Sequence, residues 1–271
     1  NFDPGSMTPP DGFDPGNFDP SNFDPSSMAP PDAVAGATPD ADKNTAETSG
    51  ESESDSTKGL KGSSSVEISG GTLTIDSADD TVHSDGDVFI SGGKLTLNSG
   101  DDGIHAGSRL EISGGETNIT KSYEGLEGAA ITISGGIVEL VTSDDGINAS
   151  DGSAQIGLGS YSKEVQLTIS GGSVYVDAAG DGLDSNGDLT ISGGLVLVNG
   201  PTNGANGALD SNGKLTLTGG VLIAAGSSGM AEYPDESSTQ YSVSATFDSS
   251  QSAGTLVTLL DSSGKELEFC S

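Results

Sequence analysis

Pairs of acidic residues followed by glycine recur along the chain at nearly constant spacing. The clearest copies are Asp101-Asp102-Gly103 and Asp144-Asp145-Gly146, and a further polar residue follows each second Asp by three positions, at His105 and Asn148. Carboxylate and amide oxygens are the ligands that Ca2+ prefers. Asp-Gly is equally a common turn signal, so an isolated pair of this kind is typical of a solvated corner. The stacking of the copies therefore decides between these two interpretations.

Alignment of the copies arranges their polar residues in two columns. The first column contains Asp80, Asp102, Glu124, Asp145 and Asp181; the second contains His83, His105, Glu127, Asn148, Asp184 and Asp210. Equivalent residues of stacked parallel strands lie about 4.8 Å apart, where two carboxylates repel by about 3.5 kcal/mol at an effective dielectric near 20. An ion midway between them would lie about 2.4 Å from each oxygen, inside the calcium–oxygen range. We therefore expect several Ca2+ ions, held by residues Asp79, Asp80, Asp101, Asp102, Glu124, Glu127, Asp144, Asp145, Asn148, Asp181, Asp184, Asn186, Asp210 and Asn212.

Two histidines of the second column and one nearby lysine could do other chemistry. His83 and His105 occupy adjacent positions of the second column, where they could bind a transition metal or serve as hydrogen-bonding corner residues. Lys121 precedes the Glu124 corner and is the candidate base of a lyase in which calcium neutralises a uronate carboxylate. The alternative for Lys121 is an ordinary solubilising charge. No Ser-His-Asp, Cys-His or nucleotide-binding motif is found in the sequence.

Short β-strands must position these columns. An Ile/Leu-Ser/Thr-Gly-Gly element occurs seven times, at spacings of 22, 22, 21, 36, 22 and 26 residues, beginning at Ile68, Ile90, Ile112, Ile133, Ile169, Ile191 and Leu217. Apolar residues alternate on both sides of it, and a third apolar position follows each acidic corner, at Val82, Ile104, Leu126, Ile147, Leu183 and Leu209. Three strands per turn of about 22 residues predict an all-β fold, a right-handed parallel β-helix. A hydrophobic content of 32% with 42 glycines suits its narrow core.

Four segments are expected. Residues 1–32 form an extended tail with four Phe-Asp-Pro copies, residues 33–62 a low-complexity linker, residues 63–226 the β-helix, and residues 227–271 a small C-terminal β cap with strands near 242–247, 255–260 and 266–269. The two long spacings predict insertions within residues 150–164 and 199–206. The tail phenylalanines suit docking into a neighbouring subunit, which would join copies into an oligomer or fibre: Phe2, Phe13, Phe18 and Phe23.

Charge and hydropathy exclude several classes of partner. The chain has 41 acidic and 9 basic residues and a net charge of −32, which repels nucleic acid and anionic membrane surfaces. No apolar run is long enough to insert into a membrane. The first residue is Asn1 rather than Met, and we interpret the chain as a mature protein that is secreted or attached to the cell surface. The single cysteine, Cys270, cannot form an internal disulfide.

The repeated motifs resemble those of bacterial secreted carbohydrate-binding domain-containing β-helix proteins. The resemblance rests on Ile-Ser-Gly-Gly, on residues 101–106 and 144–149, and on residues 180–187, and we place it over residues 63–271. It implies a fold similar to polysaccharide lyases that binds several Ca2+ ions and an acidic or cellulosic polysaccharide, through Asp79, Asp80, Asp101, Asp102, Asp144, Asp145, Asp181, Asp184 and Asp210. The third repeat departs from the pattern, with Tyr123-Glu124 in place of Asp-Asp.

Two functions are consistent with these patterns. The first is a non-enzymatic, calcium-binding extracellular protein that binds polysaccharide and self-assembles through its tail. The alternative is a calcium-dependent lyase of pectate-like glycans, with Lys121 as its base.

Overall fold

The computed structural model describes residues 57–152 and 162–265, and within them every regular element is a β-strand. The chain divides into two units, one of which, Ser56–Thr246, contains all fourteen strands found in the described residues. Residues 247–265 are the described part of the second unit. No helix in the described ranges is capable of spanning a membrane.

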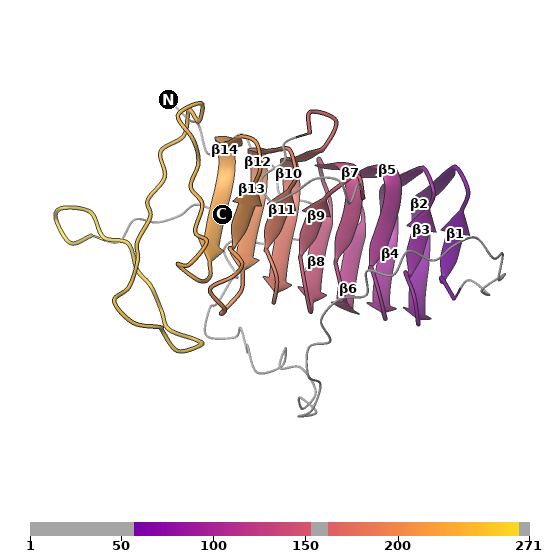
Figure 1. Ribbon diagram of the computed structural model, residues 1–271, viewed down its shortest axis with the longest axis horizontal. Helices are drawn as coiled ribbons and strands as arrows, with labels where there is room; N and C mark the ends of the chain where they lie inside the picture. Colours follow the sequence, from indigo (N-terminus) through magenta and orange to yellow (C-terminus); the bar gives the residue numbers. More distant parts are fainter. Residues whose placement is uncertain (1–56, 153–161, 266–271) are drawn as a thin grey trace, which may run out of the picture. The chain divides into compact units, whose positions relative to one another are not determined.

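The fourteen strands stack as a parallel β-solenoid (Figure 1). Strands that run through a Gly-Gly corner are β2 (Ser65–Ser77), β4 (Asp87–Ser99), β10 (Gln166–Ala178), β12 (Asp188–Asn199) and β14 (Leu215–Ala225). The two middle turns are divided into β5 (Ile104–Ile112), β6 (Glu116–Ser122), β7 (Leu126–Ile133) and β8 (Ile137–Thr142). Short strands at the third position of a turn are β1 (Leu60–Gly62), β3 (Val82–Ser84), β9 (Ile147–Ala149), β11 (Leu183–Ser185) and β13 (Leu209–Ser211). Their pairing confirms three short strand segments in each turn.

Alternating apolar residues fill the interior of the solenoid, as predicted. Parallel pairing stacks Val88 on Leu110 and Leu110 on Ile131, and all three side chains are fully buried. The third apolar position of each turn forms another such row, in which Ile104 pairs with Leu126. Because every rung repeats the same inward positions, the core is continuous although each turn contributes few apolar residues.

Glycines make the corners for two different reasons. Gly93, the second glycine of its Gly-Gly corner, has φ of +100°, a conformation that costs other residues steric strain. Gly146, at an acidic corner, instead needs space: a Cβ there would lie 2.2 Å from Val176 Cγ1 and 2.5 Å from the Gly182 carbonyl oxygen. The acidic corner is therefore packed against the next rung, and the adjoining carboxylates are held close to the core.

The start of the predicted β-helix and the predicted C-terminal cap need correction, whereas the last strand ends at Ala225 as expected. The solenoid begins at Leu60 rather than at residue 63, because Lys58-Gly59-Leu60-Lys61-Gly62 forms a rung that pairs with β3. The predicted strands at 242–247 and 255–260 are absent from the described residues, and 266–269 lie outside them. Alternation there is not matched by a core: Tyr241 is 99% exposed and Leu256 is 87% exposed.

A loop covers the last strand in place of the predicted strands. The Asp235 and Thr239 amides donate to the carbonyl oxygens of Leu215 and Leu217 at 2.8 Å and 3.2 Å, and Gln240 Nε2 donates to the Gly220 carbonyl oxygen at 3.0 Å. These bonds occupy part of the open backbone edge of β14 and so limit edge pairing. The second predicted insertion lies between β12 and β13. The first corresponds to the segment between β9 and β10, of which residues 153–161 lie outside the described residues.

Candidate functional site

The second polar column forms on the short strands that follow the acidic corners. Strand register places its members in one row, each paired with the next: Lys61, His83, His105, Glu127, Asn148, Asp184 and Asp210. Six of these residues were predicted to stack. Lys61 was missed, although Leu60-Lys61-Gly62 occupies the same place in its rung as Ile104-His105-Ala106.

The first column forms at the corners themselves, through backbone hydrogen bonds between rungs. The Gly103 amide donates to the Glu124 carbonyl oxygen at 2.9 Å, and the Gly146 amide donates to the Asp181 carbonyl oxygen at 2.8 Å. The Gly59 amide makes the same bond to the Asp80 carbonyl oxygen at 2.9 Å. Lys58 therefore begins the first column, as Lys61 begins the second, so both columns start with a cation that the acidic repeat does not indicate.

Lys58 neutralises the first acidic pair. Its Nζ lies 2.5 Å from Asp80 Oδ2 and 3.1 Å from Asp79 Oδ1, and the Asp80 side chain is 3% exposed. Burial opposes the charged form of Lys58, but hydrogen bonds to Asp80 and Asp79 raise its pKa above the usual value. The site at Asp79 and Asp80 therefore already contains a cation.

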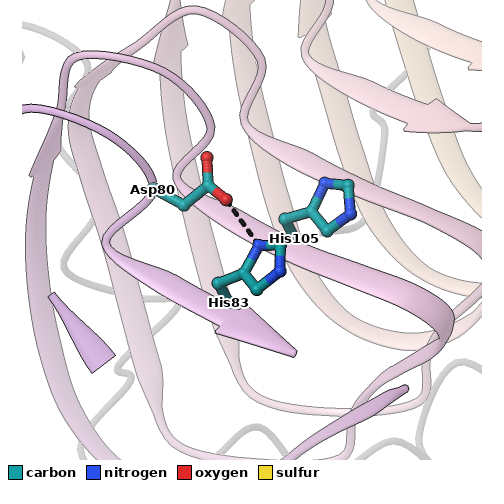
Figure 2. A group of neighbouring side chains, drawn as sticks. All are labelled: Asp80, His83 and His105. Atoms are coloured by element: carbon teal, nitrogen blue, oxygen red, sulfur yellow. Dashed lines mark hydrogen bonds and ion pairs between the residues drawn. The ribbon is translucent and has the colours of Figure 1, made fainter. Parts of the chain in front are cut away.

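His83 and His105 occupy the next two rungs of the second column and contact carboxylates there. Their rings stack with centroids 4.7 Å apart and planes 12° from parallel (Figure 2). His83 Nδ1 lies 2.6 Å from Asp80 Oδ2, and His83 Nε2 lies 3.0 Å from Asp85 Oδ1. His105 Nδ1 lies 3.4 Å from Asp102 Oδ2 and also contacts Glu127 Oε2. Hydrogen bonds to Asp102 and Glu127 raise the pKa of His105 to about 10, so at neutral pH it is a further cation in the column.

Several carboxylates of the first column also have a structural role. One oxygen accepts the backbone amide of the next rung: Asp145 Oδ1 from Asp181 at 2.6 Å, and Asp181 Oδ1 from Gly207 at 2.5 Å. Asp80 Oδ1 accepts the Asp102 amide in the same way at 3.2 Å. These bonds explain why Asp recurs at the corner. They leave the second carboxylate oxygen of each residue for another partner.

The middle rung carries the departure from the repeat. Glu124 accepts hydrogen bonds from Asn148 Nδ2 at 3.1 Å to each carboxylate oxygen. Burial, followed by the charges of Glu127 and Asp102, raises the pKa of Glu124 to about 8. Tyr123 hydrogen-bonds to Asp144, which raises the Tyr123 pKa to about 12. The Asn148 Oδ1 atom is buried without a hydrogen-bond partner among the described residues.

The last rungs bring together carboxylates for which no ion pair is found in the described part of the chain. Asp145 and Asp184 have pKa values raised to about 7 and about 8, first by burial and then by other carboxylates, with Asp210 contributing to both. Burial and Asp210 also raise the pKa of Glu232, a residue of the loop after β14. Ion pairs found in the described ranges involve none of these four residues. Glu232 belongs to no repeat, so no sequence signal indicated it.

Some predicted ligands lie elsewhere. Asn186 and Asn212 occupy the corner after the short strand, where Asn212 Nδ2 donates to Asn186 Oδ1 at 2.9 Å. Asp101 is exposed as a whole residue at its corner, but its carboxylate is partly desolvated. This desolvation, followed by the charge of Asp80, raises the Asp101 pKa. Lys121 is exposed beside Asn98, and no ion pair of its side chain is found in the described parts of the chain. The tail residues Phe2, Phe13, Phe18 and Phe23 lie outside the described residues.

Comparison with known families identifies one similarity. Residues 33–103 match the family model of carbohydrate-binding domain-containing proteins. No curated protein and no solved structure matches the chain. The matched segment covers strands β1 to β4 of the described residues. It also contains Lys58, Asp80, His83 and Asp102. The match ends at residue 103 of 271, whereas the motif resemblance was placed over residues 63–271.

Proposed function

We propose that the protein is a non-enzymatic β-solenoid that binds polysaccharide and is secreted or displayed on the cell surface. The match of residues 33–103 to the carbohydrate-binding domain-containing family supports the polysaccharide part of this proposal. Secretion or surface display remains an inference from the sequence. A stack of parallel strands suits a long polymer, because it presents the same side-chain positions again at every rung. The exposed position of Lys121 adds no support to the lyase alternative.

We further propose that Ca2+ ions bind on the last rungs of the two columns. The donor set there is oxygen only, from Asp145, Asp181, Asp184, Asp210 and Glu232, and it fits a hard cation. The first rungs contain Lys58, Lys61, His83 and His105, so their carboxylates have less need of an ion. We therefore place calcium after the Glu124 rung rather than along the whole of each column.

The charge of the protein connects calcium to the choice of polysaccharide. At a net charge of −32 the protein repels an acidic glycan, unless a bound divalent cation accepts a uronate carboxylate as a further ligand. A neutral cellulosic glycan needs no such bridge. Calcium dependence of binding therefore distinguishes the two polysaccharide classes.

Sedimentation with insoluble cellulose and titration with polygalacturonate test this proposal, each with Ca2+ and with EDTA. We expect binding to polygalacturonate only with Ca2+, or binding to cellulose in both conditions. Polygalacturonate binding with Ca2+ should weaken at least tenfold in Asp184→Asn, while Asp85→Asn, at an exposed corner residue, serves as the matched control. Absence of binding to both glycans would contradict the polysaccharide role, and unsaturated products from polygalacturonate would favour the lyase.

We also propose that the N-terminal tail joins copies of the protein. The Phe-Asp-Pro copies at Phe2, Phe13, Phe18 and Phe23 support this, since regularly spaced aromatic side chains can fill pockets of a neighbour. Removal of residues 1–32 should convert assemblies to monomers in light scattering while leaving calcium binding unchanged. Assemblies that persist without the tail would refute its joining role.

A further inference from the structure

Asp102, His105 and Glu127 form a compact group on two adjacent rungs. One ligand atom from each lies within 4.8 Å of the others. His105 Nδ1 is the centre of the group, 3.4 Å from Asp102 Oδ2 and in contact with Glu127 Oε2. Two ligands of a tetrahedral ion at about 2.1 Å are separated by roughly 3.4 Å, so the imidazole and the Asp102 carboxylate already have a suitable spacing.

The neighbouring histidine does not complete a second site of this kind. Asp80, His83 and His105 also converge, but the two rings are stacked 4.7 Å apart and only 12° from parallel (Figure 2). Their in-plane nitrogen lone pairs therefore run side by side, and one ion cannot lie about 2.1 Å from both nitrogens. Both nitrogens of His83 already contact carboxylates, and Lys58 lies against Asp80.

A small pocket lies beside His105 and Glu127. Its other lining residues include Gly107 on β5 and Ser150, Asp151 and Gly152 after β9. The side chains of His105 and Glu127 are 27% and 20% exposed, so the group can be reached from solvent. Three protein ligands beside an open space are typical of a metal centre that keeps one position for water or another exchangeable ligand.

We propose that Asp102, His105 and Glu127 bind one divalent transition-metal ion of the zinc class, with the fourth position opening into this pocket. The imidazole distinguishes this centre from the oxygen-only positions proposed for calcium, because nitrogen ligands suit Zn2+, Co2+ or Cu2+ better than Ca2+. The ion takes the place of the proton that His105 Nδ1 shares with the two carboxylates, and its binding releases that proton. This proposal depends neither on polysaccharide binding nor on calcium.

Titration of the full chain with Zn2+ by calorimetry tests the proposal, with excess Ca2+ present to fill oxygen-only sites. We expect one Zn2+ per chain, and His105→Gln should weaken it at least about tenfold. The matched control is His83→Gln, which removes the stacked neighbour but none of the three ligands, and its affinity should stay within about threefold of the parent protein. Zinc X-ray absorption of the parent protein should detect one imidazole ligand.

Three results would overturn the proposal: no Zn2+ binding by the parent protein, unchanged binding by His105→Gln, or an equal loss in both histidine variants. Glu127→Gln provides a second test if His105→Gln does not fold, as judged by its melting curve. It keeps the size of the side chain while removing a charged ligand, and retention of full Zn2+ affinity would also contradict the site.

Discussion

The Lys58 ammonium lies 2.5 Å from Asp80 Oδ2, at the place where an acidic column begins with a cation. Asp80 is 3% exposed and Lys58 is 16% exposed in their side chains, so water solvates this pair poorly. A metal ion is not required to compensate the Asp80 charge. The two polar columns therefore have a first part that contains internal cations and a last part whose carboxylates form no ion pair within residues 57–152 and 162–265.

Lys58→Met should destabilise the solenoid strongly, because the buried Asp80 carboxylate loses its ammonium partner and keeps only His83 and a backbone amide. Removing one member of a buried pair costs about 3–5 kcal/mol. The matched control is Lys94→Met, since Lys94 pairs with Glu116 on the surface and such pairs contribute about 0–1 kcal/mol. Urea unfolding followed by circular dichroism measures both changes. Equal effects of the two substitutions would contradict a special role for Lys58.

Without divalent ions, the stability of the protein should fall as the pH rises from about 4 to about 8. The folded-state pKa values of Asp145 and Asp184 are raised to about 7 and about 8, first by burial and then by neighbouring carboxylates. Unfolded aspartates titrate near 3.9, so between these values the folded protein binds more protons, and each group costs about 1.4 kcal/mol per pH unit. Carboxylates whose folded-state pKa is lowered, such as Asp79, change the stability only at pH values below this window.

Melting temperatures in EDTA at several pH values check this prediction. Asp184→Asn should make the profile less steep between pH 4 and pH 8, because the amide does not ionise while Asp145 and Glu124 still do. Asp85→Asn should leave the slope in that window unchanged, since its carboxylate is exposed and its pKa is lowered by the hydrogen bond from His83. A stability that rises steadily to pH 8 would contradict the assigned shifts.

Calcium should raise the melting temperature at neutral pH, and EDTA should reverse the change. Binding to the folded state alone stabilises it by about 2.7 kcal/mol at a free ligand concentration of 100 Kd. Asp210→Asn should reduce the calcium effect, because Asp210 contributes to the raised pKa values of Asp145 and Asp184. Asp87→Asn, beside Arg109, should retain the full effect. Scanning calorimetry measures the shifts, and an unchanged melting temperature would count against structural calcium.

Gly146→Ala should destabilise the fold although the backbone is not in the left-handed region. The added Cβ would lie 2.2 Å from Val176 Cγ1 and 2.5 Å from a backbone oxygen, and overpacking of this kind typically costs about 1–3 kcal/mol. Gly70→Ala is the control, since a Cβ there meets nothing within 4 Å. Comparable unfolding midpoints for the two variants would contradict the close packing of Gly146 against Val176 and the Gly182 carbonyl oxygen.

The repeat by itself predicted the solenoid and most residues of the two polar columns. Each turn contains its own alternating strands and corners, so the position of His105 above Glu127 follows from equal spacing. Stacking in parallel register then needs no long-range information, because every rung repeats the contacts of the last.

The tertiary structure decided what the repeat does not encode. Apolar and polar residues alternate at 242–247, but the apolar side chains there have no core to pack against, and no strand forms. Lys58 and Glu232 lie beside the polar columns because they belong to the first rung and to the loop after the last strand. Lys58 contacts Asp80, and Glu232 lies near enough to Asp210 for that charge to raise its pKa. The partners of His105 depended on side-chain direction, which spacing along the chain does not specify. Repetition fixes which residues share a row, whereas contacts at the ends and across rows arise only when the chain is packed.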